Sequence, residues 1–274
     1  MQQVLGSEST TTLTVSLFGK FSVQFGDSPL AALDPGLGQA LFSYLLLHQD
    51  QPQPCEALAG LLWDDVSVAQ AKNNLDQALH QLQTALATQA GSPLPDLLQI
   101  EPGWIQLHSA AGLRLDAALF ESAFNLCQNH DSRQLTLAQI QMLQSAVELY
   151  QGDLLEGWLQ TWCIYARERF QYQYLAMLDK LLNYCVAHQA YATGIRYGAR
   201  ILHYDQARER THRQLMRLYY LAGDRTGALH QYERCVALLR KELGVGPARQ
   251  TVALYEQLRA DQPMFGSPAQ GTAL

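Results

Sequence analysis

The sequence predicts a mostly helical protein of two parts: an N-terminal part in which short β elements flank three helices, and a C-terminal part built of helix pairs. Alternating apolar and polar residues at 13–19 and 21–27 are typical of paired strands. Apolar residues recur at helical spacing from residue 37 to about 88, and from 116 almost to the end. In the last third, one hydrophobic pattern returns after 34 residues.

The N-terminal elements follow one another in a recognisable order. The two predicted strands turn at Gly19-Lys20, and a loop at 28–36 leads into helices predicted at 37–48, 55–63 and about 68–88. Two short alternating runs at 97–108, around Pro102-Gly103, then predict a hairpin. Three helices followed by a hairpin is the order of a winged helix, a helix-turn-helix variant whose third helix enters the major groove.

The 34-residue pattern predicts tetratricopeptide-like helix pairs, which stack to bury their apolar faces and form concave binding surfaces. The first copy has Leu181, Tyr184, Cys185, His188, Gly194, Ile195, Ile201 and Leu202, and the second has Leu215, Leu218, Tyr219, Ala222, Ala228, Leu229, Cys235 and Val236. Gly194 and Ala228 fall where facing helices approach closely. Gly223 follows an apolar run and supplies a positive φ, and Asp224 then caps the next helix. With Tyr232, these residues form the predicted repeat-packing set: Gly194, Ala228, Tyr232 and Gly223.

Further helices are predicted at 116–127, 135–150 and 162–188, before the repeat pair. The resulting organisation is a winged-helix domain at 13–112 and a helical repeat domain at 113–260. The ends, 1–12 and 261–274, are expected to be flexible tails.

Charge is distributed unevenly along the chain, whose formal net charge is −6. Residues 1–120 carry three basic side chains (Lys20, Lys72 and Arg114) against eleven acidic ones, whereas residues 121–274 carry sixteen against fourteen. Because Lys and Arg supply most of the non-specific affinity for nucleic acid, the acidic first part counts against strong DNA binding.

Several function classes are disfavoured by the sequence. The N-terminus has no basic start followed by an apolar run, and no stretch approaches the ~20 apolar residues of a membrane span, so a cytoplasmic protein without membrane contact is expected. The five cysteines stand singly, without metal-ligand spacing. Catalytic and phosphate-loop motifs are missing, so we expect no catalytic residues, no cofactor, no metal and no enzyme activity.

Residues 218–258, LYYLAGDRTGALHQYERCVALLRKELGVGPARQTVALYEQL, resemble the bacterial transcriptional activator domain. GDLLEGW at 152–158 and YARERF at 165–170 are similar to its earlier helices, and residues 13–124 are similar to the winged helix that precedes it. The combination resembles the SARP-type transcriptional activators. The resemblance implies promoter DNA as a partner, a third helix that reads the major groove, and a repeat domain that dimerises or contacts RNA polymerase or another protein.

The third predicted helix supplies the candidate DNA-binding residues: Lys72, Asn73, Asn74, Gln77, His80 and Gln81. Asn and Gln side chains can pair with the N6/N7 edge of adenine. The matching helix of the family is usually rich in arginine, whereas here a single lysine stands beside Asp76. The alternative interpretation is a solvated face of a structural helix.

Two functions therefore stay open on the sequence. The first is a transcriptional regulator that binds promoter DNA through the winged helix. The second is a protein-interaction adaptor that keeps the same fold but has lost strong DNA binding.

Overall fold

The computed structural model describes residues 12–29, 33, 36–87, 97–110, 112–132 and 134–262. Contacts group the chain into two compact units, residues 1–125 with 145–173 and residues 126–144 with 174–274. Apart from Thr12, Asp261 and Gln262, the predicted tails at 1–12 and 261–274 lie outside the described residues. Most of the described residues are helical, with the strands gathered before residue 116, as the sequence predicts.

The first unit contains a sheet in which strands from both sides of the three predicted helices meet. Its order is β3-β2-β1-β7, and the strands are β1 (Leu13–Ser16), β2 (Ser22–Phe25), β3 (Ser28–Pro29) and β7 (Leu113–Leu115). β1 runs antiparallel to β2 and parallel to β7. The turn between β1 and β2 contains Gly19 with φ 77°, a conformation that glycine adopts without a steric penalty. β3 and β7 were not predicted, because two or three residues are too few to show alternation.

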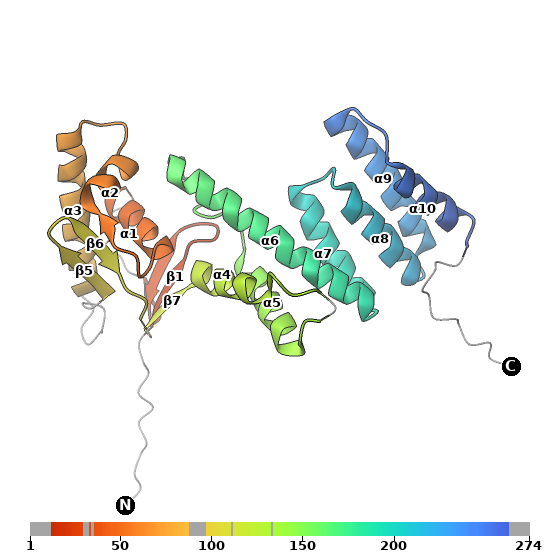
Figure 1. Ribbon diagram of the computed structural model, residues 1–274, viewed down its shortest axis with the longest axis horizontal. Helices are drawn as coiled ribbons and strands as arrows, with labels where there is room; N and C mark the ends of the chain where they lie inside the picture. Colours follow the sequence, from red (N-terminus) through yellow and green to blue (C-terminus); the bar gives the residue numbers. More distant parts are fainter. Residues whose placement is uncertain are drawn as a thin grey trace, which may run out of the picture. The chain divides into compact units, whose positions relative to one another are not determined.

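The winged-helix order is present in the first unit. The elements are α1 (Leu37–Leu47), β4 (Gln53–Pro54), α2 (Cys55–Leu62), α3 (Val68–Ala87), β5 (Leu98–Glu101) and β6 (Trp104–Leu107). β4, β6 and β5 form a second, antiparallel sheet in that order. α3 packs on both α1 and α2, as Figure 1 shows. Its buried stripe includes Leu75, Ala78 and Leu82, which lie at helical spacing.

A buried carboxylate ties β1 to the start of α4 (Asp116–Cys127). The Asp116 side chain accepts hydrogen bonds from the backbone N–H groups of Leu17 at 2.9 Å and Phe18 at 3.0 Å. Burial raises the pKa of Asp116, although these N–H donors oppose the shift. The Phe18 ring contacts the rings of Phe120 and Phe170, so the end of β1 is anchored in the core of this unit.

The segment after α5 (Leu137–Leu149) also attaches to the end of β1. The Gly19 N–H donates to the carbonyl of Asp153 at 2.9 Å, and the Glu156 N–H donates to the carbonyl of Gly19 at 2.8 Å. Arg167, in α6 (Thr161–Ala187), donates to three carbonyls of the connection that precedes its own helix, those of Leu154, Leu155 and Trp158. This connection is therefore held by defined hydrogen bonds on both sides.

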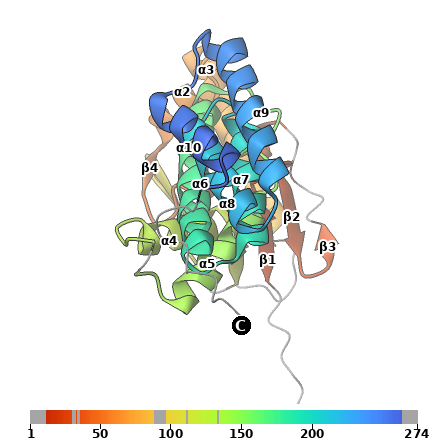
Figure 2. The same cartoon turned by 90° about the vertical axis from the view of Figure 1, so that its right-hand side faces the viewer.

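The second unit consists of paired helices. After the C-terminal part of α6 come α7 (Tyr191–Tyr204), α8 (Glu209–Leu221), α9 (Arg225–Leu243) and α10 (Arg249–Arg259). α8 packs against both α7 and α9, and α10 packs against α9 and α8. These helices succeed one another from teal to blue in Figure 1, and Figure 2 views them from the C-terminal side. Leu181 and Ile201 of the first copy of the pattern are buried, as are their counterparts Leu215 and Cys235, whereas buried Cys185 corresponds to the partly buried Tyr219.

Candidate nucleic-acid interface and helical repeat surface

The exposed face of α3 carries most of the predicted DNA-binding residues. Lys72, Asn73, Gln77 and His80 are exposed, on the side of the helix away from its buried stripe. Asn73, Gln77 and His80 follow one another at intervals of four and three residues, so their side chains share one stripe of the helix. This face could present amide, imidazole and ammonium groups together to a nucleic acid.

The remaining two predicted residues are differently placed. Asn74 is half-buried, and its Oδ1 accepts a hydrogen bond from Gln70 Nε2 at 2.9 Å. Gln81 is also half-buried; its Oε1 is buried without a hydrogen-bond partner and lies near Gly38 of α1. Gln81 therefore faces the helix packing more than the solvent.

Lys72 is held by a partner that sequence reasoning missed. Its Nζ lies 3.1 Å from Glu56 Oε1 on α2, and the two side chains are 53% and 84% exposed. An ion pair this exposed contributes at most about 1 kcal/mol, so a phosphate could take the place of Glu56 at small cost. Glu56 and Lys72 are 16 positions apart and belong to different helices, so no helix-spacing argument could predict the pairing.

The β5–β6 hairpin is the wing of this arrangement. Its turn contains Gly103 with φ 92°, beside the exposed Glu101. An exposed carboxylate on the wing adds to the acidic character of the first 120 residues. Phosphate binding by this part of the chain would therefore depend on few cationic groups.

Three of the four predicted repeat-packing residues, Gly194, Ala228 and Tyr232, lie at helix contacts in the second unit. A Cβ on Gly194 would come within 3.0 Å of Leu218 in α8 and 3.1 Å of Cys185 in α6. Ala228 is fully buried beside Met216. Tyr232 stacks on Tyr255 with ring centroids 4.0 Å apart.

Gly223 lies outside these contacts and ends α8 with φ 84°. The following residue, Asp224, caps α9 by accepting a hydrogen bond from the Gly227 N–H at 2.7 Å. The turn between the two helices thus has the conformation expected from its Gly-Asp sequence.

A closer approach than any predicted one occurs at Gly198 of α7. A Cβ there would lie 2.6 Å from Leu215 Cδ2 and 2.9 Å from Leu215 Cγ. The counterpart of Gly198 one repeat later is Tyr232. Since the 34-residue comparison pairs a glycine with a large aromatic residue here, it gave no sign that this position requires a small one.

A fully buried histidine joins α8 to α9. His212 Nε2 lies 2.8 Å from the carbonyl oxygen of Gln206 and Nδ1 lies 2.7 Å from Gln231 Nε2. A carbonyl oxygen can only accept, so Nε2 carries the proton and Nδ1 accepts from Gln231. Burial lowers the pKa of His212, and the imidazole is neutral at physiological pH.

The arginines between 196 and 217 do not act as one cluster. Arg208 pairs with Asp179 at 2.6 Å, and Arg213 lies 3.7 Å from Glu209 and donates to Thr251 at 2.9 Å. Arg200 donates to the Tyr174 hydroxyl at 2.8 Å. Arg210 and Arg217 are both exposed, and neither forms a hydrogen bond or ion pair with another described residue.

Within the described ranges, no group of three or more His, Cys, Asp or Glu side chains is placed to hold a metal ion. Burial raises the pKa of Cys163 to about 12 and that of Cys235 to about 11, so both thiols are protonated and poor nucleophiles at neutral pH. Over the part of the chain that the structure describes, no helix has the length and apolar character needed to cross a membrane.

The architecture is that of a regulator with a winged-helix arrangement followed by stacked helix pairs. A family model for the bacterial transcriptional activator domain matches residues 115–259, more than half of the chain. The chain therefore belongs to this family of transcriptional regulators, which is not a family of enzymes, and its relatives are SARP-like. Membership of a class of transcriptional regulators implies action on DNA.

Two curated relatives and one solved structure agree with this assignment. The transcriptional regulatory protein MoaR1 of Mycobacterium tuberculosis H37Rv is 25% identical over 229 residues, covering 82% of this chain and 73% of the relative. MoaR1 of Mycobacterium bovis BCG is 26% identical over 231 residues, with the same coverage. Mycobacterium tuberculosis EmbR, solved in complex with a low affinity phosphopeptide, has a TM-score of 0.74 at 20% identity and shares the fold over 93% of this chain and 67% of its own.

Proposed function

We propose that this protein is a cytoplasmic transcriptional regulator that binds promoter DNA through α3 and contacts a protein partner through its helical repeats. In this proposal residues 13–112 carry the DNA contact, and residues 113–260 carry dimerisation or the contact with RNA polymerase or another protein. The proposal rests on the exposed face of α3, which carries Lys72, Asn73, Gln77 and His80. Two helices precede α3 in the chain, and a hairpin follows it. Such a helix presents its outer face to the major groove.

Within this face the residues have different roles. Asn73 and Gln77 have the amide groups that pair with adenine, and His80 extends the same stripe toward the end of the helix. Lys72 supplies the phosphate contact after leaving Glu56. Asn74 and Gln81, which are half-buried, hold the helix in place more than they touch bases.

The test is a fluorescence-anisotropy titration of random-sequence duplex DNA at low and moderate salt. The wild-type chain should bind at low salt and lose affinity steeply as salt rises, because phosphate contacts release counterions. Lys72→Glu should abolish binding. Lys20→Glu is the matched control, because it makes the same charge change at an exposed position in the β1–β2 turn.

The control separates a local contact from a general charge effect. If the two variants weaken binding equally, the assignment of α3 as the contact is wrong. If the wild-type chain fails to bind even at low salt, the adaptor function is favoured instead. The acidic balance of residues 1–120 is the specific observation behind that second candidate.

A further inference from the structure

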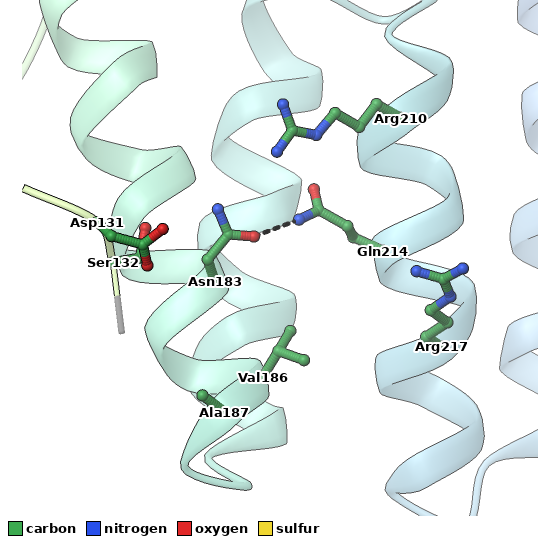
Figure 3. Close-up of a pocket in the computed structure, with 8 residues that line it drawn as sticks. All are labelled: Asp131, Ser132, Asn183, Val186, Ala187, Arg210, Gln214 and Arg217. Atoms are coloured by element: carbon green, nitrogen blue, oxygen red, sulfur yellow. Dashed lines mark hydrogen bonds between the residues drawn. The ribbon is translucent and has the colours of Figure 1, made fainter. Parts of the chain in front are cut away.

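The second unit contains a groove that none of the predicted sites uses. It is a pocket of about 520 Å³ between α6, α8 and the segment that joins α4 to α5. Figure 3 shows Asn183 on α6 facing Arg210, Gln214 and Arg217 on α8, with Asp131 on the joining segment. All these residues belong to the second unit.

The α8 wall of the groove carries two cationic groups, Arg210 and Arg217, that have no partner among the described residues. Arg210, Gln214 and Arg217 are spaced by four and three residues, so they lie along one face of α8. Both arginines are exposed, and among the described residues neither has a hydrogen bond or an ion pair. The neighbouring Arg208 and Arg213 pair with Asp179 and Glu209. The positive charges of Arg210 and Arg217 therefore remain to attract a ligand in the groove.

Between the two arginines lies an amide pair with unused hydrogen-bonding capacity. Gln214 Nε2 donates to Asn183 Oδ1 at 2.7 Å, which leaves Asn183 Nδ2 as a donor. Gln214 Oε1 is buried and has no hydrogen-bond partner. Asn183 Nδ2 can therefore donate to the carbonyl oxygen of a peptide unit that lies in the groove.

We propose that this groove binds an extended acidic segment of a partner protein, with two carboxylates three residues apart in the partner's sequence. Arg210 and Arg217 are seven positions apart in α8, which is about 10.5 Å along a helix axis. In the polyproline II conformation, an extended chain has three residues per turn and advances about 3.1 Å per residue, so side chains at i and i+3 share one face and are about 9.3 Å apart. The carboxylates at i and i+3 pair with Arg210 and Arg217, and the intervening backbone meets Asn183 and Gln214.

The opposite wall favours a peptide over nucleic acid. Asp131 lies across the groove from α8, and among the residues that line the groove the cationic ones, Arg210 and Arg217, both belong to α8. A pocket of about 520 Å³ admits a few residues of one extended chain and is too small for a duplex. Val186 on the floor offers apolar contact to a side chain between the two acids.

The inference deepens the partner role proposed for the helical repeats. It is tested with the full chain and fluorescein-labelled ten-residue peptides of Gly and Ser that contain two glutamates. One peptide has the glutamates at i and i+3, a second has them adjacent, and a third has glutamines at i and i+3. Anisotropy at low salt should show binding of the first peptide, with affinity at least about threefold weaker for the second and weaker still for the third.

Two double variants localise the site. Arg210→Ala/Arg217→Ala should weaken binding of the first peptide about tenfold. Arg196→Ala/Arg249→Ala removes the same charge from exposed positions outside the groove and should leave binding unchanged. The circular dichroism spectra of both variants should match that of the wild type.

Several outcomes would overturn the inference: no binding of the first peptide, equal affinity for the two glutamate spacings, or equal effects of the two double variants. A groove occupied by nucleic acid would instead lower duplex-DNA affinity in the Arg210→Ala/Arg217→Ala variant without any peptide binding. A groove occupied by a second copy would make that variant monomeric in sedimentation when the wild type is not. Lys72→Glu should leave peptide affinity unchanged, so failure of the DNA proposal is distinguishable from failure of this one.

Discussion

Lys72 Nζ on α3 lies 3.1 Å from Glu56 Oε1 on α2. Lys72 is the only lysine or arginine of α3, so the sole fixed positive charge on the candidate recognition helix is shared with a carboxylate of the preceding helix. Binding DNA through this helix requires the pair to open, and the strength of the pair therefore sets part of the affinity.

Glu56→Gln should strengthen DNA binding. The substitution removes a negative charge near the proposed interface and frees Lys72, so we expect about a two- to fivefold gain in affinity at low salt. Anisotropy with duplex DNA measures it. Asp27→Asn, which removes an exposed carboxylate from the β2–β3 turn, is the control. Equal gains from both substitutions would show that only net charge matters and that the pair does not restrain Lys72.

Gly198→Ala should destabilise the second unit. Its Cβ would lie 2.6 Å from Leu215 Cδ2 and 2.9 Å from Cγ, so α7 and α8 must separate or Leu215 must leave its place. Overpacking of this kind costs about 1–3 kcal/mol, partly offset by the better helix propensity of alanine, about 1 kcal/mol. Urea denaturation should show a net loss of up to about 2 kcal/mol. Gly60→Ala on α2 meets open space and should be neutral or stabilising; the same loss at both positions would contradict the packing argument.

The stability of the chain should fall as pH drops below about 6.5, in part through His212. Burial lowers the pKa of His212 in the folded state, so folding favours the neutral imidazole. That contribution is complete above the unfolded pKa and is lost as pH falls through the folded pKa, at no more than about 1.4 kcal/mol per pH unit for one proton. Urea denaturation at pH 8 and pH 5.5 should show the difference. His212→Gln should reduce it, and an unchanged pH dependence in that variant would exclude His212 as its source.

Arg167→Ala should cost about 2–4 kcal/mol of stability, because three carbonyl groups each lose a hydrogen bond from the guanidinium. Arg167→Lys should restore only part, since an ammonium cannot reproduce the planar geometry of the guanidinium. Arg169→Ala, two residues along the same helix, breaks the half-exposed pair with Glu121 and removes the guanidinium that lies 4.8 Å from the centre of the Phe170 ring, so it should cost less than about 2 kcal/mol. Thermal denaturation of the three variants gives the ranking, and a similar loss for Arg167→Ala and Arg169→Ala would refute the carbonyl-binding role.

Much of the helical framework could be predicted, because the spacing of apolar residues along the chain indicates each helix locally. The apolar stripe that includes Leu75, Ala78 and Leu82 predicted α3 to within one residue of its observed end, and the Gly223-Asp224 turn has the predicted left-handed φ. The 34-residue repeat predicted the stacking of helix pairs because equivalent positions are buried in both copies.

Contacts between distant residues were not predictable from such patterns. The bond from Leu17 to Asp116 spans 99 positions, and nothing in the spacing of either residue signals it. The arginines from 196 to 217 looked alike in sequence, and only their three-dimensional neighbours separate the paired Arg208 from the unpaired Arg210. Pairings of this kind depend on tertiary packing, which a hydrophobic period does not encode.

The anchoring of β1 has a consequence for how such regulators can exchange parts during evolution. The amides of Leu17 and Phe18 find their acceptor at Asp116, and Gly19 bonds to Asp153, although the candidate DNA-reading elements all lie between these positions. Recombination just after residue 112 would replace the whole N-terminal segment, including β1. The backbone amides after the new β1 would then lack their carboxylate acceptor, unless the recipient chain has a carboxylate at the position of Asp116. Recombination within the loops after β2 and before β7 avoids this loss. It exchanges only the segment from α1 to β6 and keeps β1 together with Asp116 and Asp153.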